Sequence, residues 1–212
     1  MKFLKITLYP IIFSFLIIGS VPTLERKDSR DINNIELEIT KNNDFIQNGI
    51  RLEYETLNSV EDEINKIEKS INEELEINVE VSNNTITYKD PLKEIKVIVW
   101  KAEKINKVQI SYLNQLKNKN ILNLENEVNK IKSKKGQNYK YFLYTKVKIL
   151  DEKAYEVVEN NINKESIQRI DIHNGSAFKG ISKNGTRINV GYIKYDTGEY
   201  LIVGSPIIFE TY

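Results

Sequence analysis

The chain has 212 residues, with 31 Lys or Arg and 30 Asp or Glu, so its formal net charge at pH 7 is +1. It contains no Cys and one His, which excludes disulfides, thiolate nucleophiles and thiolate metal sites, and most imidazole-based metal sites as well. A chain of this length suits one domain, or two half-domains that share a core.

The N-terminus has the composition of an export signal. Two lysines precede the apolar run of residues 6–18, and the small residues Gly19 and Ser20 follow it. This order predicts a signal peptide or an uncleaved N-terminal anchor over residues 1–24, and therefore an extracytoplasmic protein that is secreted or held at the cell membrane. The polar residues 25–44 are interpreted as a tether between membrane and domain.

The first half of the chain reads as strand, helix and meander. Residues 46–57 alternate, with Ile50, Leu52 and Tyr54 on one face, which predicts a half-buried strand. The helix that follows is expected to be capped at Asn58 or Ser59. Its apolar stripe recurs every three or four residues: Val60, Ile64, Ile67, Ile71 and Leu75.

A meander is expected after this helix. Short alternating runs lie on either side of the turn residues Asn83 and Asn84. Residues 94–101 are apolar at nearly every position from Ile95 to Trp100, which predicts a central strand covered on both faces.

The order of patterns then starts again. Residues 106–114 resemble residues 48–56, and residues 125–134 resemble residues 61–70, with matched Glu, Asn, Lys and Ile positions. We therefore expect two similar halves, residues 45–105 and residues 106–212. The alternative is that two amphipathic helices in a chain rich in Lys, Asn and Ile are alike by chance.

The C-terminal part predicts a four-stranded antiparallel meander. Four alternating runs between residues 167 and 209 are separated by Asn174-Gly175, Asn184-Gly185 and a turn at residues 196–198. Asn-Gly between alternating runs predicts a type I′ hairpin turn, with positive φ at both central residues.

Charge divides the chain. Residues 25–100 contain 10 basic and 18 acidic residues, whereas residues 101–148 contain 12 basic and 3 acidic ones. The two halves could attract one another, or the basic one could face an anionic membrane surface or wall polymer, or nucleic acid if the protein is not exported. Tyr139, Tyr141 and Tyr144 lie nearby and could stack bases, although strands favour tyrosine in any case. The candidate basic surface comprises Lys130, Lys132, Lys134, Lys135 and Lys140.

No motif for catalysis, for a cofactor or for a metal is present. His173 alternates with polar residues at the edge of a turn and is expected to face water. With 30 acidic residues, a carboxylate pair for glycosidic hydrolysis can be drawn in many places, but no pair is singled out by an apolar setting. We therefore expect a non-enzymatic protein without cofactors, with a cell-wall hydrolase as an alternative.

The last hairpin carries a family resemblance. Gly175, Ala177, the run 187–190 and above all the run 202–208 (IVGSPII) make the chain similar to the YwmB-like family of exported proteins from spore-forming Gram-positive bacteria, also described as TATA-box-binding-like. Three further positions look structural, because Gly185 belongs to a turn, Gly204 permits close approach or a bulge, and Pro206 lacks a ladder donor.

The resemblance implies an α+β fold of two similar halves, each a curved antiparallel sheet backed by helices, as in the TATA-binding protein. With the N-terminal segment and the absence of catalytic motifs, we expect an exported binding or scaffold protein of the cell envelope, to which the resemblance alone adds a link to sporulation. The partner would be an anionic membrane surface, a wall polymer or an envelope protein. The alternative is a TATA-binding-protein-like nucleic-acid binder, which export would exclude from chromosomal DNA.

Overall fold

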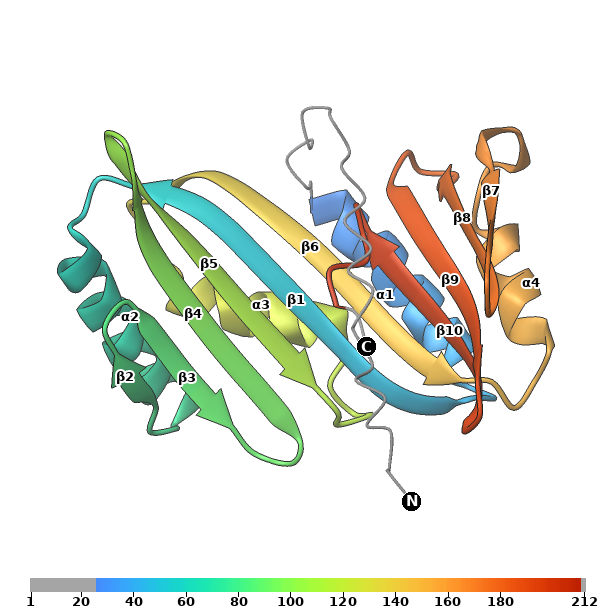
Figure 1. The fold of residues 1–212 in the computed structure, drawn as a ribbon, viewed down its shortest axis with the longest axis horizontal. Coiled ribbons are helices and arrows are strands. Elements are labelled where there is room, and N and C mark those ends of the chain that lie inside the picture. Colours follow the sequence, from blue (N-terminus) through green and yellow to red (C-terminus); the bar gives the residue numbers. More distant parts are fainter. Residues whose placement is uncertain (1–25, 211–212) are drawn as a thin grey trace, which may run out of the picture.

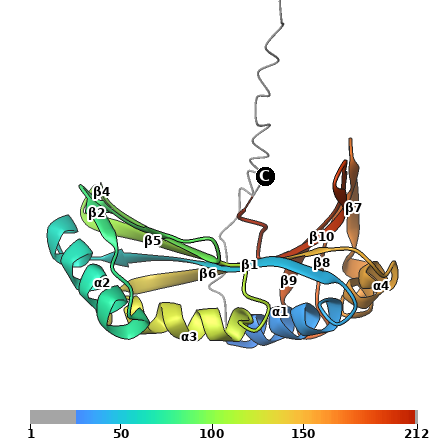
Figure 2. The same cartoon turned by 90° about the horizontal axis from the view of Figure 1, so that it is seen from below.

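The computed structural model describes residues 26–210, and within them it shows a two-layer α+β fold. Ten strands form one antiparallel sheet, and four α-helices cover one of its faces (Figure 1). Seen from the side, the sheet is curved, and the helices lie in a row along its convex side in the order α2, α3, α1, α4 (Figure 2). The predicted α+β class is confirmed.

The predicted signal peptide or anchor, residues 1–24, lies outside the described residues. Among residues 26–210, no helix has the length and the hydropathy needed to cross a bilayer.

The tether prediction for residues 25–44 is wrong. Residues Arg26–Ile39 form helix α1, and strand β1 already begins at Asp44. Ile32, Ile35 and Ile39 follow at helical spacing and are buried in the core, so this segment is an integral part of the domain.

The elements fall into two groups that run in the same order, namely helix, strand, helix and four strands. The first group is α1, β1 (Asp44–Thr56), α2 (Val60–Leu75), β2 (Glu80–Ser82), β3 (Thr85–Lys89), β4 (Lys93–Ala102) and β5 (Ile105–Asn114). The second group is α3 (Ile121–Ile131), β6 (Gln137–Lys148), α4 (Lys153–Asn160), β7 (Gln168–Ile172), β8 (Gly175–Ile181), β9 (Arg187–Tyr195) and β10 (Gly198–Ser205), with the 3₁₀ helix η1 (Lys164–Ser166) before β7.

The sheet order repeats this arrangement, because it reads β2-β3-β4-β5-β1 and then β6-β10-β9-β8-β7. In each group the first strand lies in the centre of the sheet beside the last strand of its own group. The boundary between the groups therefore lies between β5 and α3, and not at residues 105–106 as expected. Residues 48–56 and 106–114 are β1 and β5, which pair antiparallel with one another, so the expected correspondence between them is not reflected in the topology.

The central pair, β1 and β6, contains two irregularities in its register, at Phe45/Gln47 and at Glu53/Glu55. Asn138 lies at the second one and has a positive φ of 56°. Bulges bend and twist a strand pair. One irregularity lies near each end of β1.

Helix α2 agrees with the sequence prediction. Ser59 is its N-cap, and the Ser59 side chain accepts a hydrogen bond from the Asp62 backbone N–H. Ile64, Ile67 and Ile71 are buried against the sheet. The C-terminal meander is also found, as β7 to β10.

Two local predictions are wrong. Strand β4 is third from its edge of the sheet, but it is buried on one face only, since Ile95, Val97 and Val99 are buried while Lys96 and Trp100 are exposed. Neither Asn-Gly turn is type I′, because Asn174, Gly175 and Asn184 have no positive φ.

Candidate functional site

The fold places no helix on the concave face of the sheet (Figures 1 and 2). The helices take the side of Ile50, Leu52 and Tyr54, so alternate residues of each strand point to the opposite side (Figures 1 and 2). Three large apolar side chains remain exposed there, with 37% of Trp100, 38% of Ile170 and 45% of Ile181 accessible. Trp100 is on β4 whereas Ile170 and Ile181 are on β7 and β8, at the other end of the sheet, so the three do not form one apolar patch.

Basic side chains outnumber acidic ones on this face. The strand register places nine basic residues there: Arg51, Lys89, Lys96, Lys107, Lys140, Lys146, Lys148, Lys179 and Arg187. It places five acidic residues there: Asp44, Glu53, Glu55, Glu80 and Glu94. The excess of positive charge lies on the face that the helices do not cover.

In the first group of strands the basic groups surround Trp100. Lys107 of β5 lies directly opposite Trp100 of β4, and Lys96 lies four residues from Trp100 on the same face. All three side chains are exposed, so they can reach a bound molecule together.

In the second group, Lys146 of β6 lies against two tyrosine rings. Its ammonium nitrogen is 4.6 Å from the centre of the Tyr200 ring and 6.0 Å from that of Tyr195. Burial lowers the pKa of Lys146 to about 8, so the group is still mainly cationic at neutral pH. A cation held against aromatic rings keeps a defined position.

Residues 206–210 follow β10 and cross the middle of the concave face; we call them the C-terminal strap. The Phe209 ring lies between Arg51 and Tyr144. Burial lowers the pKa of Arg51, and burial also raises the pKa of Glu210, an effect that the Arg51 charge partly offsets. The strap therefore contacts strands of both groups, namely β1 and β6 through Phe209 and β9 through Pro206.

The five lysines predicted as one basic surface do not lie on one face. Lys130 is on α3, where its ammonium is 3.5 Å from Glu74 of α2, and Lys134 and Lys135 are exposed in the loop before β6. Lys132 points back under the sheet, while Lys140 belongs to the concave face. The five lysines are close in the sequence, but they belong to a helix, a loop and a strand that follow one another, so they do not share a face.

The three tyrosines near these lysines are not open for base stacking. Tyr139 packs on Tyr54 with ring centres 5.3 Å apart, and Tyr141 receives a hydrogen bond from Lys132 of 2.6 Å. Tyr144 faces the concave side but is fully buried and contacts Phe209.

The predicted structural residues lie at close backbone contacts or turns. A Cβ at Gly175 would be 1.9 Å from the Tyr192 carbonyl oxygen, so only glycine fits there. Gly185 has a φ of 96° in the β8–β9 turn. Gly204 lies under the C-terminal strap, and Pro206 follows directly after β10, with a cis peptide bond before it.

Within residues 26–210, no group of three or more His, Asp or Glu side chains is arranged to hold a metal ion. His173 is exposed, as predicted, in the turn between β7 and β8.

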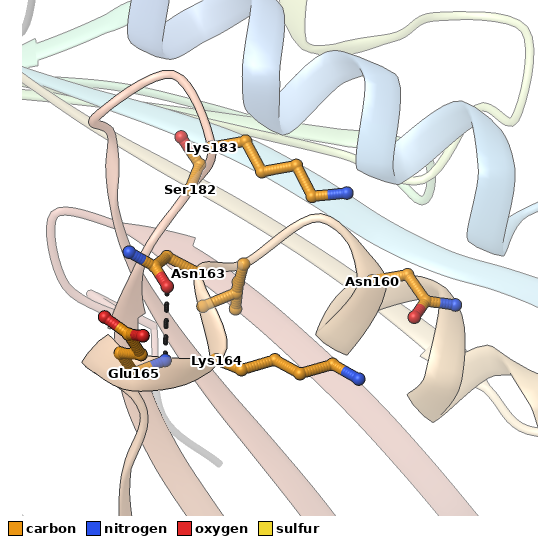
Figure 3. Close-up of a pocket in the computed structure, with 7 residues that line it drawn as sticks. Asn160, Asn163, Lys164, Glu165, Ser182 and Lys183 are labelled. Carbon is orange, nitrogen blue, oxygen red and sulfur yellow. Dashed lines mark hydrogen bonds between the residues drawn. The ribbon is translucent and has the colours of Figure 1, made fainter.

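A cavity of about 640 Å³ lies between the C-terminal end of α4, the 3₁₀ helix η1 and the β8–β9 turn (Figure 3). Lys164 and Lys183 extend in the same direction there, toward the side of Asn160, and Asn163 accepts a hydrogen bond from the Glu165 backbone N–H. The lining polar groups are mostly exposed, and Glu165 is its single carboxylate. This composition does not provide a pair of acids for hydrolysis.

No known protein-family model matches the sequence, and no curated protein matches it either. The resemblance to the YwmB-like family therefore stays a prediction.

The concave face brings together residues that local sequence patterns do not single out. Arg51, Lys96 and Lys107 are separated by up to 56 positions in the chain and meet through the pairing β4-β5-β1. A partial signal was present, because Arg51 alternates with the apolar residues of its strand and so had to lie on the face opposite the core.

Proposed function

We propose that this protein is an exported, non-enzymatic binding module of the cell envelope that holds an extended anionic partner on its concave face. The observation that carries the proposal is the excess of positive charge on the concave face. This face has no helix and holds nine basic and five acidic side chains, together with the exposed Trp100. The composition of residues 1–24 supports export.

The shape of the face favours a chain-like partner over a membrane. A flat bilayer can touch the rims of a concave surface but not its floor, whereas a flexible polymer can lie along it (Figure 2). Lysine and arginine side chains bind repeated phosphates, and their binding weakens with salt. A wall polymer with backbone phosphates is therefore the partner class that we favour.

The repeated order of elements supports an internal duplication with its boundary between β5 and α3. Two groups of helix, strand, helix and four strands, joined at β1 and β6, also support the proposed similarity to the TATA-binding protein. That similarity is the basis for the second candidate function, nucleic-acid binding. Proteins that bind the minor groove with a saddle kink the DNA with apolar wedges and read it with Arg or Asn. In this second candidate function, the exposed Trp100 and Ile181, toward the two ends of the sheet, are the apolar wedges.

The test is binding of labelled inorganic polyphosphate to the full chain, followed by anisotropy over a range of NaCl concentrations. Charge reversal of Lys96 and Lys107 together is expected to weaken binding by about tenfold or more and to reduce its salt dependence, because each neutralised phosphate contributes to the slope. The matched control reverses Lys134 and Lys135, which are also exposed but lie in the loop before β6.

Duplex DNA and vesicles that contain phosphatidylglycerol serve as competing ligands. Preference for polyphosphate with loss in the concave-face variant supports the proposal, and preference for DNA supports the second candidate. Equal loss in both double variants, or loss in the control alone, would contradict binding at the concave face.

A further inference from the structure

The C-terminal strap is held by side chains of strands that lie on both sides of the sheet centre. The Arg51 guanidinium lies 4.7 Å from the centre of the Phe209 ring, and the Tyr144 ring lies 5.7 Å from it on another side. Cation–π and tilted aromatic contacts of this kind select an aromatic side chain at this position.

The strap backbone is also bound. Arg51 donates a hydrogen bond of 3.2 Å from Nη2 to the Phe209 carbonyl oxygen, and Asn189 donates one from Nδ2 to the Pro206 carbonyl oxygen. Arg51 lies on β1 and Asn189 on β9. Because their acceptors are Phe209 and Pro206, the two donors bind the strap near its two ends. Hydrogen bonds to the backbone of a bound segment do not depend on which side chains that segment carries.

Three glycines on the concave face form the floor beneath the strap. A Cβ at Gly204 would lie 2.8 Å from the Ile207 carbonyl oxygen and 2.9 Å from the Ile208 Cα, so this position has no room for a side chain while the strap is seated. A Cβ at Gly49 would lie 3.5 Å from the Phe209 ring, and one at Gly191 would lie 3.9 Å from the Ile208 side chain. None of the three glycines has a positive φ. At Gly49 the neighbouring strand also restricts the space, because a Cβ would lie 2.6 Å from the Leu113 side chain and 3.0 Å from the Tyr112 carbonyl oxygen.

We propose that these residues form a peptide site, which accepts an extended segment of two aliphatic residues followed by an aromatic and an acidic one, and that the chain's own strap fills it reversibly. The strap adds no strand to the sheet, and residues 207–210 are all partly exposed. Segments held by few contacts open at a lower free-energy cost than the strands beneath them. Opening would uncover the three glycines beneath the strap.

The first experiment supplies the strap in trans. A labelled peptide with the sequence of residues 206–210, blocked at both ends, is titrated into the full chain and into the Phe209→Ala variant. The wild type is expected to take up little peptide, because its tethered strap competes at an effective concentration on the order of millimolar. Phe209→Ala is expected to bind the peptide at least about tenfold more tightly than the wild type.

The second experiment uses two glycines of the floor. Gly204→Ala places a methyl group where strap backbone lies, whereas Gly191→Ala meets contacts of 3.7 to 3.9 Å, which are ordinary van der Waals distances. Chymotrypsin should therefore cleave after Phe209 about tenfold faster in Gly204→Ala than in the wild type or in Gly191→Ala, because cleavage follows the population of the open state. Peptide uptake should stay absent in Gly204→Ala, since its floor is filled.

Equal cleavage of the two alanine variants would overturn the proposal, and so would a folded Phe209→Ala protein that takes up no peptide. Should Phe209→Ala fail to fold, the comparison of the two glycine variants still decides. Neither readout involves an anionic polymer, so the peptide site and the proposed function stand or fall separately.

Discussion

The buried carboxyl group of Glu36 allows a quantitative test of the packing between the two groups of elements. Glu36 of α1 is 2% exposed and accepts hydrogen bonds from Asn48 Nδ2 at 2.6 Å and from the Ile121 backbone N–H at 2.8 Å. It thereby links the first helix of the first group to the first helix of the second. Burial raises its pKa to about 7, and these hydrogen bonds oppose the rise only in part.

The sign of the resulting pH dependence follows from linkage. Between the ordinary pKa of 4.5 and the folded value of about 7, the native state keeps a proton that the unfolded state has lost. The contribution of this carboxyl group to the free energy of unfolding is therefore fully present below pH 4.5 and is lost as the pH rises to about 7. The loss amounts to roughly 3 kcal/mol. Glu36→Gln removes the charge but keeps the size of the side chain.

Urea unfolding of the wild type and of Glu36→Gln at pH 5 and pH 8 measures this effect. The stability of the variant relative to the wild type is expected to rise by roughly 3 kcal/mol between the two pH values. Glu38→Gln is the control, because Glu38 lies on the exposed side of the same helix. A relative stability of Glu36→Gln that does not change with pH would refute the assignment of the buried charge.

Two other substitutions test buried hydrogen bonds. Tyr54→Phe removes the 2.6 Å hydrogen bond to the fully buried Glu63, so urea unfolding should show a loss of about 1 to 3 kcal/mol, against a smaller change for Tyr88→Phe, whose hydrogen bond to Asp90 is only partly buried. A loss no larger than in Tyr88→Phe would show that Glu63 does not depend on this donor. Asp31→Ala removes the acceptor for three side chains of the β8–β9 turn and should cost about 2 kcal/mol or more by the same assay, whereas Asp196→Ala in an exposed turn should be nearly neutral. Equal effects of the two aspartate variants would contradict a structural role for Asp31.

The strands and the later helices could be predicted from the sequence because their periodicity reports local burial. Alternation at Ile50, Leu52 and Tyr54 and the stripe of α2 are both found in the structure. Helix α1 was missed because three isoleucines at helical spacing lie within a strongly charged segment. Strand β4 was assigned two covered faces because its continuous apolar run includes Ile98 and Trp100, which lie on the open side.

Pairing between distant strands could not be predicted in the same way. The similarity of residues 106–114 to residues 48–56 reflects two neighbouring central strands and not equivalent positions in two halves. The concave face depends on this pairing, and so does the strap, whose contact with Arg51 joins residues 158 positions apart. Local patterns carry little information about such contacts.

Lysine labelling tests the use of the concave face most directly. The full chain is treated with an amine-reactive reagent in the presence and absence of inorganic polyphosphate, and modification of each lysine is measured by mass spectrometry. Binding on the concave face predicts protection of Lys96 and Lys107 and unchanged labelling of Lys134 and Lys135. Protection confined to Lys134 and Lys135, or no protection at saturating polyphosphate, would contradict it.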